Sequence, residues 1–398
     1  MSQLALALDP SPAASWALPE GAASAGPRTG HAPPDGPGLH TGVRTGFEAE
    51  GRRIGWEHAR HQITPPADHL HLHHPVRQGW EAGRAALAGR ALAPTRAARL
   101  WLDLRLQAWL RGRAFEELLV TPRFVALIDV RCCPVTGVLL TQAAPGVEGP
   151  DDAVVMPLYE RAGCAVGNLA VVSRQVAQAR AALSLHEMAQ TVQRLQQPGA
   201  APHAAGLDLW AWRRLAALTS LVTPQDHASA AARALLVLPP PRVRVLNPVQ
   251  ALQVLLTQVF DGPGYARELT DLGALLPCGP ARRAYFLFMS AMLARRLSAR
   301  GAVPPDQMRA AMEQAWSHPL VLQRWQALAT GLTPAQCEHL TRRLAQRRAA
   351  GAGRSTWRWM DDQAATDGWA LQTQGRAGAE APMPPVKRRC PAARGRRA

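Results

Sequence analysis

The chain has little cysteine, almost no lysine and no long apolar run. Its first residues show no basic segment followed by a long apolar stretch, so a secretory signal is not indicated. The longest apolar run, near Ala284 to Ala294, is far shorter than a membrane-spanning helix. The cysteines form no CxxC pair, which favours a reducing compartment over a secreted, disulfide-bonded protein. We therefore expect a cytoplasmic protein without a membrane partner. The six cysteines are Cys132, Cys133, Cys164, Cys278, Cys337 and Cys390.

Acidic residues are also scarce. The 398 residues hold 45 Lys and Arg against 29 Asp and Glu, a net charge of +16. Such a balance favours a polyanionic partner, DNA or RNA, held by non-specific attraction. Part of the excess belongs to residues 351–398, which we predict to be a mostly disordered basic tail. Such a tail is either a solvated segment or a nucleic-acid arm. Its basic cluster is Lys387, Arg388, Arg389, Arg394, Arg396 and Arg397.

Two stretches near the N-terminus lack a regular pattern. Residues 1–55 mix Pro, Gly, Ala and Ser with few periodic apolar positions, so we predict that they are disordered. A histidine-rich segment follows, and on a strand His69, His71 and His73 would share one face. Prolines interrupt it, however, and no cysteine or paired carboxylate completes a metal shell. We interpret it as a surface loop with adventitious metal affinity. Its histidines are His58, His61, His69, His71, His73 and His74.

Three helices are predicted before the middle of the chain, over residues 76–92, 95–113 and 121–129. In the second, Leu100, Trp101 and Leu104 recur at helical spacing, and Thr95 is a good N-cap. Its arginines lie mostly on the opposite side, as a solvated face or as a surface that meets phosphates. They are Arg96, Arg99, Arg105, Arg111 and Arg113.

The stretch from Cys132 to Arg180 differs from the helical sequence around it. The segment Cys133-Pro134-Val135-Thr136-Gly137 predicts a tight turn between two short β segments. Asp151 or Asp152 is placed to cap a segment that runs to Ala162. The segment from Gly163 to Asn168 predicts a second corner, since Gly and Asn tolerate a left-handed backbone. A helix is expected over residues 169–180.

The order CPVTGxxLT, a variable loop and then GCxxGNLAVVS resembles the HNH-like (His-Me finger) nuclease modules of bacterial and phage proteins. The resemblance covers residues 133–180 and implies a small ββα fold, with a core at residues 130–182. It is similar above all to a variant with a Cys-Pro-x-Thr turn and a Gly-Tyr-x-x-Gly-Asn corner. The positions that carry the motif are Cys133, Pro134, Thr136, Gly137, Gly163, Gly167 and Asn168.

The sequence departs from this family where the family's chemistry lies. Met156 and Pro157 stand where the resemblance implies an Asp or His followed by Arg, and Cys164 replaces the Tyr. Ala177 and Arg180 replace the Asn and Lys of the helix. Met and Pro neither accept a proton from water nor bind Mg²⁺ as hard oxygen ligands do. We therefore interpret the module as inactive and assign no metal site.

Substitutes for the lost groups are few. Asp151, Asp152 and Glu160 are the carboxylates that an active, divalent-metal-dependent nuclease would use. Arg174 and Arg180 on the following helix are the candidates for nucleic-acid binding. Cys132, Cys133 and Cys164 supply three ligands of a zinc site, but no fourth is identifiable, so we interpret them as free thiols.

The C-terminal half is predicted to be a run of helices, except for short extended pieces at Leu235–Leu238 and Val243–Leu246 on either side of three prolines. A helix over residues 181–197 ends at Pro198-Gly199, which we take as the boundary between a domain of residues 56–197 and a helical domain of residues 198–350. Pro follows a cap residue at Asn247-Pro248 and Thr333-Pro334. The helices expected are Leu207–Leu221, Asp226–Leu235, Pro248–Phe260, Tyr265–Leu276, Arg282–Ala299, Pro305–Trp316, Leu320–Thr330 and Pro334–Ala349.

The predicted fold is mainly α, a multi-helix protein with a small embedded ββα (HNH-like) module and disordered termini. The leading functional hypothesis is a non-enzymatic protein that binds DNA or RNA and needs no cofactor. The first alternative is an active metal-dependent endonuclease. The second is a helical protein-interaction module without nucleic acid, in which the C-terminal helices offer a groove to a partner.

Overall fold

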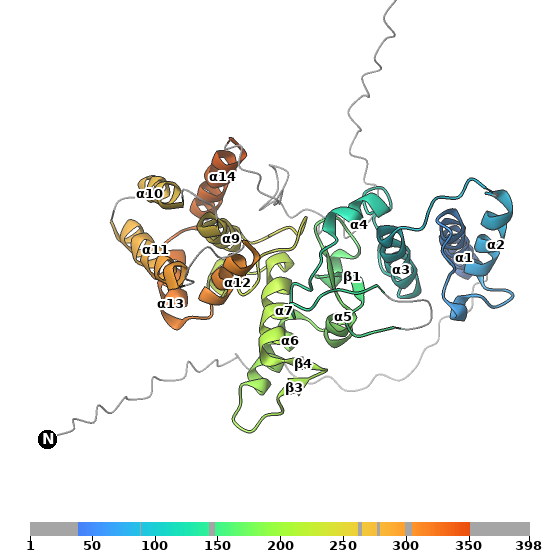
Figure 1. Cartoon of the computed structure of the whole chain (residues 1–398), viewed down its shortest axis with the longest axis horizontal. Helices are drawn as coiled ribbons and strands as arrows, with labels where there is room; N and C mark the ends of the chain where they lie inside the picture. The colour runs from blue at the N-terminus through green and yellow to red at the C-terminus, as the bar shows by residue number, and fades with distance from the viewer. Residues whose placement is uncertain are drawn as a thin grey trace, which may run out of the picture. The chain divides into compact units, whose positions relative to one another are not determined.

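The computed structural model describes residues 39–87, 89–142, 148–261, 265–276, 279–298 and 305–350. In these ranges fourteen helices and four short strands form a mainly helical protein with a small ββα element (Figure 1), which confirms the predicted fold class. Residues 1–38 and the predicted basic tail, 351–398, lie outside the described residues, as do Cys278 and Cys390. No described helix combines the length and the apolar character needed to cross a bilayer.

Helix α1 (Leu39–Arg60) occupies residues that composition predicts to be disordered, so that prediction is wrong from residue 39 onward. The chain divides into two compact parts at Gly46, and the second part begins there. Within this second part α1 touches α2 (Pro75–Ala86) through glycines. A Cβ on Gly55 would lie 1.9 Å from the Val76 carbonyl oxygen. Glycine lowers the apolar content of a sequence, yet here it allows the backbones to touch, and Ile54 is fully buried as a result.

The predicted helices at 95–113 and 121–129 are present as α3 (Arg96–Leu110) and α4 (Pro122–Ile128). Their threonine caps form as expected, and Thr95 Oγ1 accepts a hydrogen bond of 3.1 Å from the Ala98 amide. One residue of the predicted arginine face is misplaced. Arg105 is buried and pairs with Glu50 at 2.8 Å, so it is not part of a solvated surface.

The central module is a hairpin followed by a helix. Strands β1 (Ala153–Pro157) and β2 (Leu169–Ser173) pair antiparallel with Ala153 opposite Ser173 and Pro157 opposite Leu169, and α5 (Arg174–Arg180) follows. The helix predicted over residues 169–180 is thus wrong in its first five residues. Those residues are buried on both faces, and an apolar run of that kind has no period that separates strand from helix.

The turn predicted at residues 133–137 is also present. The Gly137 amide donates to the Cys133 carbonyl at 2.8 Å, and the Cys133 amide donates to the Val138 carbonyl at 2.8 Å. Gly137 has a φ of 78°, a left-handed conformation that costs a residue with a side chain more than it costs glycine. The bridge between Cys132 and Leu139 completes the short β segment on either side.

The remaining elements follow the predicted order with altered bounds. Next after α5 are α6 (Leu185–Leu195), the strands β3 (His203–Ala204) and β4 (Leu207–Asp208), α7 (Leu209–Val222) and the short α8 (His227–Ala231). The C-terminal helices are α9 (Pro248–Asp261), α10 (Tyr265–Leu275), α11 (Pro280–Ser298), α12 (Pro305–Ala315), α13 (Pro319–Ala329) and α14 (Pro334–Ala350). Helix α9 is their centre, since residues 249–260 are all buried and α10, α12 and α14 pack on it.

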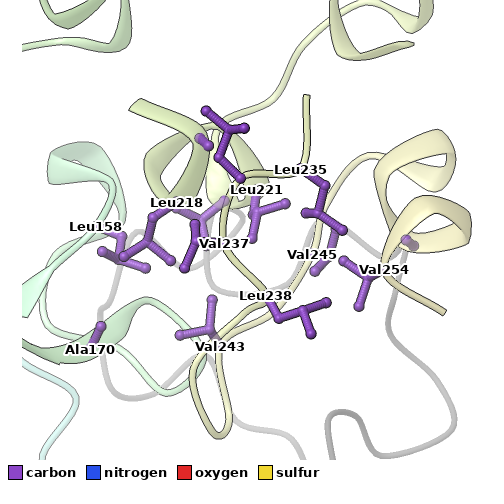
Figure 2. Packing of buried hydrophobic residues seen from close by; sticks show 14 of the residues in the cluster. Leu158, Ala170, Leu218, Leu221, Leu235, Val237, Leu238, Val243, Val245 and Val254 are labelled. Atoms are coloured by element: carbon purple, nitrogen blue, oxygen red, sulfur yellow. The ribbon is translucent and has the colours of Figure 1, made fainter. Parts of the chain in front are cut away.

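One hydrophobic core joins the central module to the C-terminal helices. Figure 2 shows Leu158 and Ala170 of the module in the same buried cluster as Leu218 of α7 and as Val243. The Arg244 amide also donates to the Gly167 carbonyl at 2.9 Å. The boundary predicted near residue 198 therefore does not coincide with a break in the core. The segment of residues 235–246, which holds three prolines at its centre, connects the two halves.

Candidate functional site in the central module

The carboxylates proposed as substitutes lie at opposite ends of the hairpin. Asp151 and Asp152 come directly before β1, whereas Glu160 follows it in a short 3₁₀ turn (Glu160–Ala162). At about 3.3 Å per residue, the five-residue strand alone separates them by roughly 16 Å. A divalent metal holds its oxygen ligands at about 2.0–2.6 Å. These three carboxylates therefore cannot share one ion.

Asp152 at the first end is a structural residue. Its side chain is buried, where Oδ1 accepts from Thr141 Oγ1 at 2.8 Å and Oδ2 accepts from the Gly149 amide at 2.6 Å. Its carbonyl accepts from the Arg174 amide at 2.8 Å, which joins the start of β1 to the start of α5. Both carboxylate oxygens are thus used to close the loop before β1. Asp151 beside it contributes a backbone carbonyl to Thr141.

Glu160 at the second end is held by two guanidinium groups. Arg113 approaches one oxygen at 2.8 Å, and Arg180 hydrogen-bonds the other. Arg180 also donates to the Leu158 carbonyl at 2.9 Å and to the Ala181 carbonyl at 3.2 Å. Burial lowers the pKa of the Arg180 guanidinium, while its hydrogen bond to Glu160 acts in the opposite direction. Both oxygens of Glu160 are thus engaged by arginines of the protein itself.

The Gly-Asn corner ties this end of the hairpin together. Asn168 is fully buried, and its Nδ2 donates to the carbonyls of Tyr159 and Gly163 at 2.8 and 2.7 Å. Its Oδ1 accepts from the Tyr159 amide at 2.9 Å. Gly163 has a φ of 61°, and a Cβ there would lie 2.7 Å from the Ala114 carbonyl oxygen. Both residues therefore serve backbone geometry.

The other motif positions behave in the same way. Gly167 adopts a φ of 90°, and the Pro134 carbonyl accepts a hydrogen bond of 2.7 Å from Arg214. Cys133 is buried, with its Sγ accepting from the Ser173 amide at 3.4 Å. Thr136 Oγ1 is buried without a hydrogen-bond partner among the described residues. The motif thus marks turns and packing, and none of these residues faces a shared reacting position.

The cysteines do not converge on a metal. Cys133 and Cys164 are buried, whereas Cys132 is exposed. Burial raises the pKa of the Cys164 thiol to about 12, with nearby Arg113 opposing and Glu160 adding to the effect. At neutral pH this thiol is therefore protonated and is neither a nucleophile nor a ready metal ligand. Met156 is buried on β1, opposite Ala170 of β2.

The histidine-rich segment does not form a metal centre either. Within the described ranges no group of three or more His, Cys, Asp or Glu side chains is placed to hold a metal ion. His58 is buried, with Nδ1 2.9 Å from the Ile54 carbonyl oxygen, and His74 Nδ1 caps α2 by accepting from the Val76 amide at 3.3 Å. His71 and His73 are exposed, in keeping with a surface loop.

The two arginines predicted to bind nucleic acid are not free to do so. Arg180 is 3% exposed and its donors are committed inside the protein, so that assignment is wrong. Arg174 is partly buried and pairs with Glu148 at 3.1 Å. The reason is that their partners, Glu148 for Arg174 and Glu160 for Arg180, lie in loops outside α5, which spacing on a helix does not reveal.

Other arginines form the exposed charge at the Glu160 end. Arg161 lies in the 3₁₀ turn next to Glu160. Arg111 is the C-cap of α3, and its charge lies close enough to Cys164 to oppose the rise in the pKa of that thiol. Both are exposed, and neither enters an ion pair within the described part of the chain. Arg113, two residues after Arg111, pairs with Glu160, the residue before Arg161. We call Arg111, Arg113 and Arg161 the basic corner. Arg111 and Arg113 belong to the predicted arginine face, whereas Arg161 had no sequence signal.

No protein-family model matches the chain, and comparison with curated proteins and with solved structures likewise finds no match.

Proposed function

We propose that this protein binds nucleic acid through its phosphates and does no chemistry on it, with the central module acting as an HNH-like scaffold. One observation carries the proposal. The carboxylates of the module are separated or paired with arginine, while Arg111 and Arg161 are exposed and enter no ion pair among the described residues. Phosphate contacts from arginine supply most of non-specific binding energy. The net charge of +16 adds long-range attraction.

The phosphate contacts are tested by a salt titration of DNA binding with the Arg111→Ala/Arg161→Ala variant. Each phosphate contact contributes about 0.9 to the slope of log K against log salt concentration on duplex DNA. The variant is therefore expected to bind more weakly and to lower that slope by about 2. Electrophoretic mobility shift over a range of salt concentrations measures both quantities.

The matched control is Arg324→Ala/Arg343→Ala, which removes the same charge from α13 and α14. These two arginines make no ion pair within the described residues. An equal loss of binding in the control would assign the interaction to general charge and reject the basic corner. Absence of binding by the natural sequence at low salt would reject the proposal itself.

The nuclease alternative has a direct test. Purified protein is incubated with plasmid and Mg²⁺, Mn²⁺ or Zn²⁺, and the Asp151→Ala/Asp152→Ala/Glu160→Ala variant is compared with it. The proposal expects no cleavage by either. Cleavage that the triple substitution abolishes would establish an active enzyme and overturn the scaffold interpretation.

A protein-interaction role is favoured by a separate observation on α11. Phe286, Leu287 and Leu297 of this helix are 46, 42 and 62% exposed. Exposed apolar side chains of this size on one helix are typical of a contact surface. Co-purification with one stoichiometric protein and without nucleic acid would support this second function. Substitution of the three residues by Ser should then abolish it.

A further inference from the structure

A groove with a volume of about 470 Å³ lies where α1 ends and α2 passes beside it. This volume is in the range of sites for small organic ligands. Ile63 and Leu87 provide apolar walls, and Trp80 adds an aromatic one. Gln62, Thr64 and Arg84 bring polar groups to the same groove. An aromatic surface combined with a cation and an amide suits a ligand in which a flat ring is attached to an anionic group.

Trp80 and Arg84 are one helical turn apart on α2. The Arg84 guanidinium lies 4.9 Å from the centre of the Trp80 ring, a cation–π contact that holds it in place. Arg84 is exposed and makes no ion pair within the described residues. Its N–H groups therefore remain available for an anion such as a phosphate.

Gln62 holds an unusual backbone position for its residue type. Its φ is 53°, and the hydrogen bond of 2.9 Å from the Ile63 amide to the His58 carbonyl ends α1 around it. Glycine is the usual residue at this point of a helix end, because a side chain in a left-handed conformation costs stability. The side chain of Gln62 nevertheless lines the groove. Its Nε2 donates to the Ala91 carbonyl at 3.3 Å, and the second N–H and the oxygen of the amide are the donor and acceptor that could read the edge of a base.

We propose that this groove binds one unpaired nucleobase, stacked on Trp80, with the attached phosphate at Arg84 and the base edge at Gln62. The proposal rests on the proposed function and makes it specific: the protein prefers single strands to duplex. A duplex hides its base faces, whereas a single strand exposes them for stacking on aromatic rings. The same chemistry occurs in a free nucleoside monophosphate.

Fluorescence anisotropy of the full chain with labelled ten-residue oligoadenylate and with a duplex of the same length tests this. Trp80→Leu should weaken single-strand binding about tenfold or more, since stacking accounts for that much per base. Duplex binding should not change. Trp80→Phe keeps a ring and should stay within about threefold of the natural sequence.

Trp210→Leu is the matched control. Trp210 is 36% exposed with the guanidinium of Arg213 at 6.0 Å from its ring, yet it does not line the groove. Its substitution should leave single-strand binding unchanged. Equal losses from Trp80→Leu and Trp210→Leu, or none from either, would overturn the inference while leaving phosphate-driven binding intact.

A calorimetric titration with adenosine monophosphate distinguishes the two possible ligands, a nucleotide within a single strand and a free nucleotide. If the protein binds neither strand form, the proposed function fails. Nucleotide binding that Trp80→Leu abolishes would then identify a free nucleotide as the occupant. Absence of binding to the nucleotide and to both strand forms would overturn the groove assignment as well.

Gln62→Gly distinguishes a ligand-binding role of Gln62 from a purely structural one, because the two roles predict different changes in melting temperature and in single-strand binding. Glycine relieves the left-handed backbone, so the melting temperature should rise by about 2 °C. Single-strand binding should fall at the same time, because the amide is lost. A rise in melting temperature with unchanged binding would remove Gln62 from the site.

Discussion

At the scale of single residues, the central motif is better explained by hydrogen bonding than by catalysis. Asn168 is the clearest case, because all its side-chain bonds go to the backbone of residues 159 and 163. Cys133 and Gly163 likewise support turns and close approach. Residues of this kind preserve a backbone path whether or not a reaction takes place on it. The hydrogen bonds of these residues therefore account for the turn and the corner without any catalytic role.

His58 makes protein stability depend on pH. Burial lowers its pKa from 6.5 to about 4, so the unfolded chain binds a proton between these values that the folded chain does not. Stability therefore falls as the pH drops from 6.5 to 4, by about 3 kcal/mol in total for this residue. Urea unfolding at pH 7.0, 5.5 and 4.5 measures the loss.

The control for this prediction is His58→Gln, which has no titrating group. It should flatten the pH profile without abolishing it, since burial also lowers the pKa values of His61, His69 and His74. An unchanged profile in His58→Gln would assign the pH dependence to other groups.

At the scale of elements, the contact between α1 and α2 depends on missing side chains. A Cβ added to Gly79 would lie 1.8 Å from the Arg52 carbonyl oxygen, a backbone atom that cannot rotate away. Gly79→Ala must therefore separate the helices, and we expect it to lower the free energy of unfolding by about 3 kcal/mol. Chemical denaturation followed by circular dichroism measures this change.

Gly46→Ala in α1 is the matched control, because nothing lies within 4 Å of a Cβ at that position. Alanine is the better helix former, so this substitution should raise stability by about 0.5–1 kcal/mol. Opposite signs for the two substitutions support close helix packing. Equal, small effects would show that the helices do not approach as closely as the structure has them.

At the scale of the whole molecule, a buried ion pair links the central module to the C-terminal helices. Arg214 of α7 binds Glu313 of α12 at 2.9 Å, and it also donates to the carbonyls of Pro134 and Leu236. The Leu238 amide donates to Glu313 at 2.9 Å. The Cys-Pro turn, the extended segment around residue 237 and α12 are thus held together at Glu313, which Arg309 of α12 also pairs with at 3.2 Å.

Removal of one partner leaves the other charged and buried. Glu313→Ala is therefore expected to lower the free energy of unfolding by about 3–5 kcal/mol. Replacement of both, as Arg214→Met with Glu313→Leu, should recover part of that loss, because the Arg214 charge is removed together with its carboxylate, while Arg309 still loses its 3.2 Å ion pair with Glu313. A double-mutant cycle in urea measures the coupling.

The exposed pair Arg342 and Glu338 on α14 is the comparison for this cycle. Surface pairs contribute about 0–1 kcal/mol, so Arg342→Ala should have little effect. A loss from Glu313→Ala as small as that from Arg342→Ala would mean that the Arg214–Glu313 pair does not bind the two halves together.

The sequence by itself determined the helices from residue 75 onward, the turn at residues 133–137 and the corner at residues 163–168. Those features depend on local causes, namely apolar spacing, caps such as Thr95 and left-handed glycines such as Gly137. Only the tertiary structure decided that Leu169–Ser173 is a strand, that Arg105 and Arg180 are buried and that Arg161 is exposed. Burial and pairing depend on residues far away in the chain, as in Arg214 with Glu313, and no local pattern contains that information.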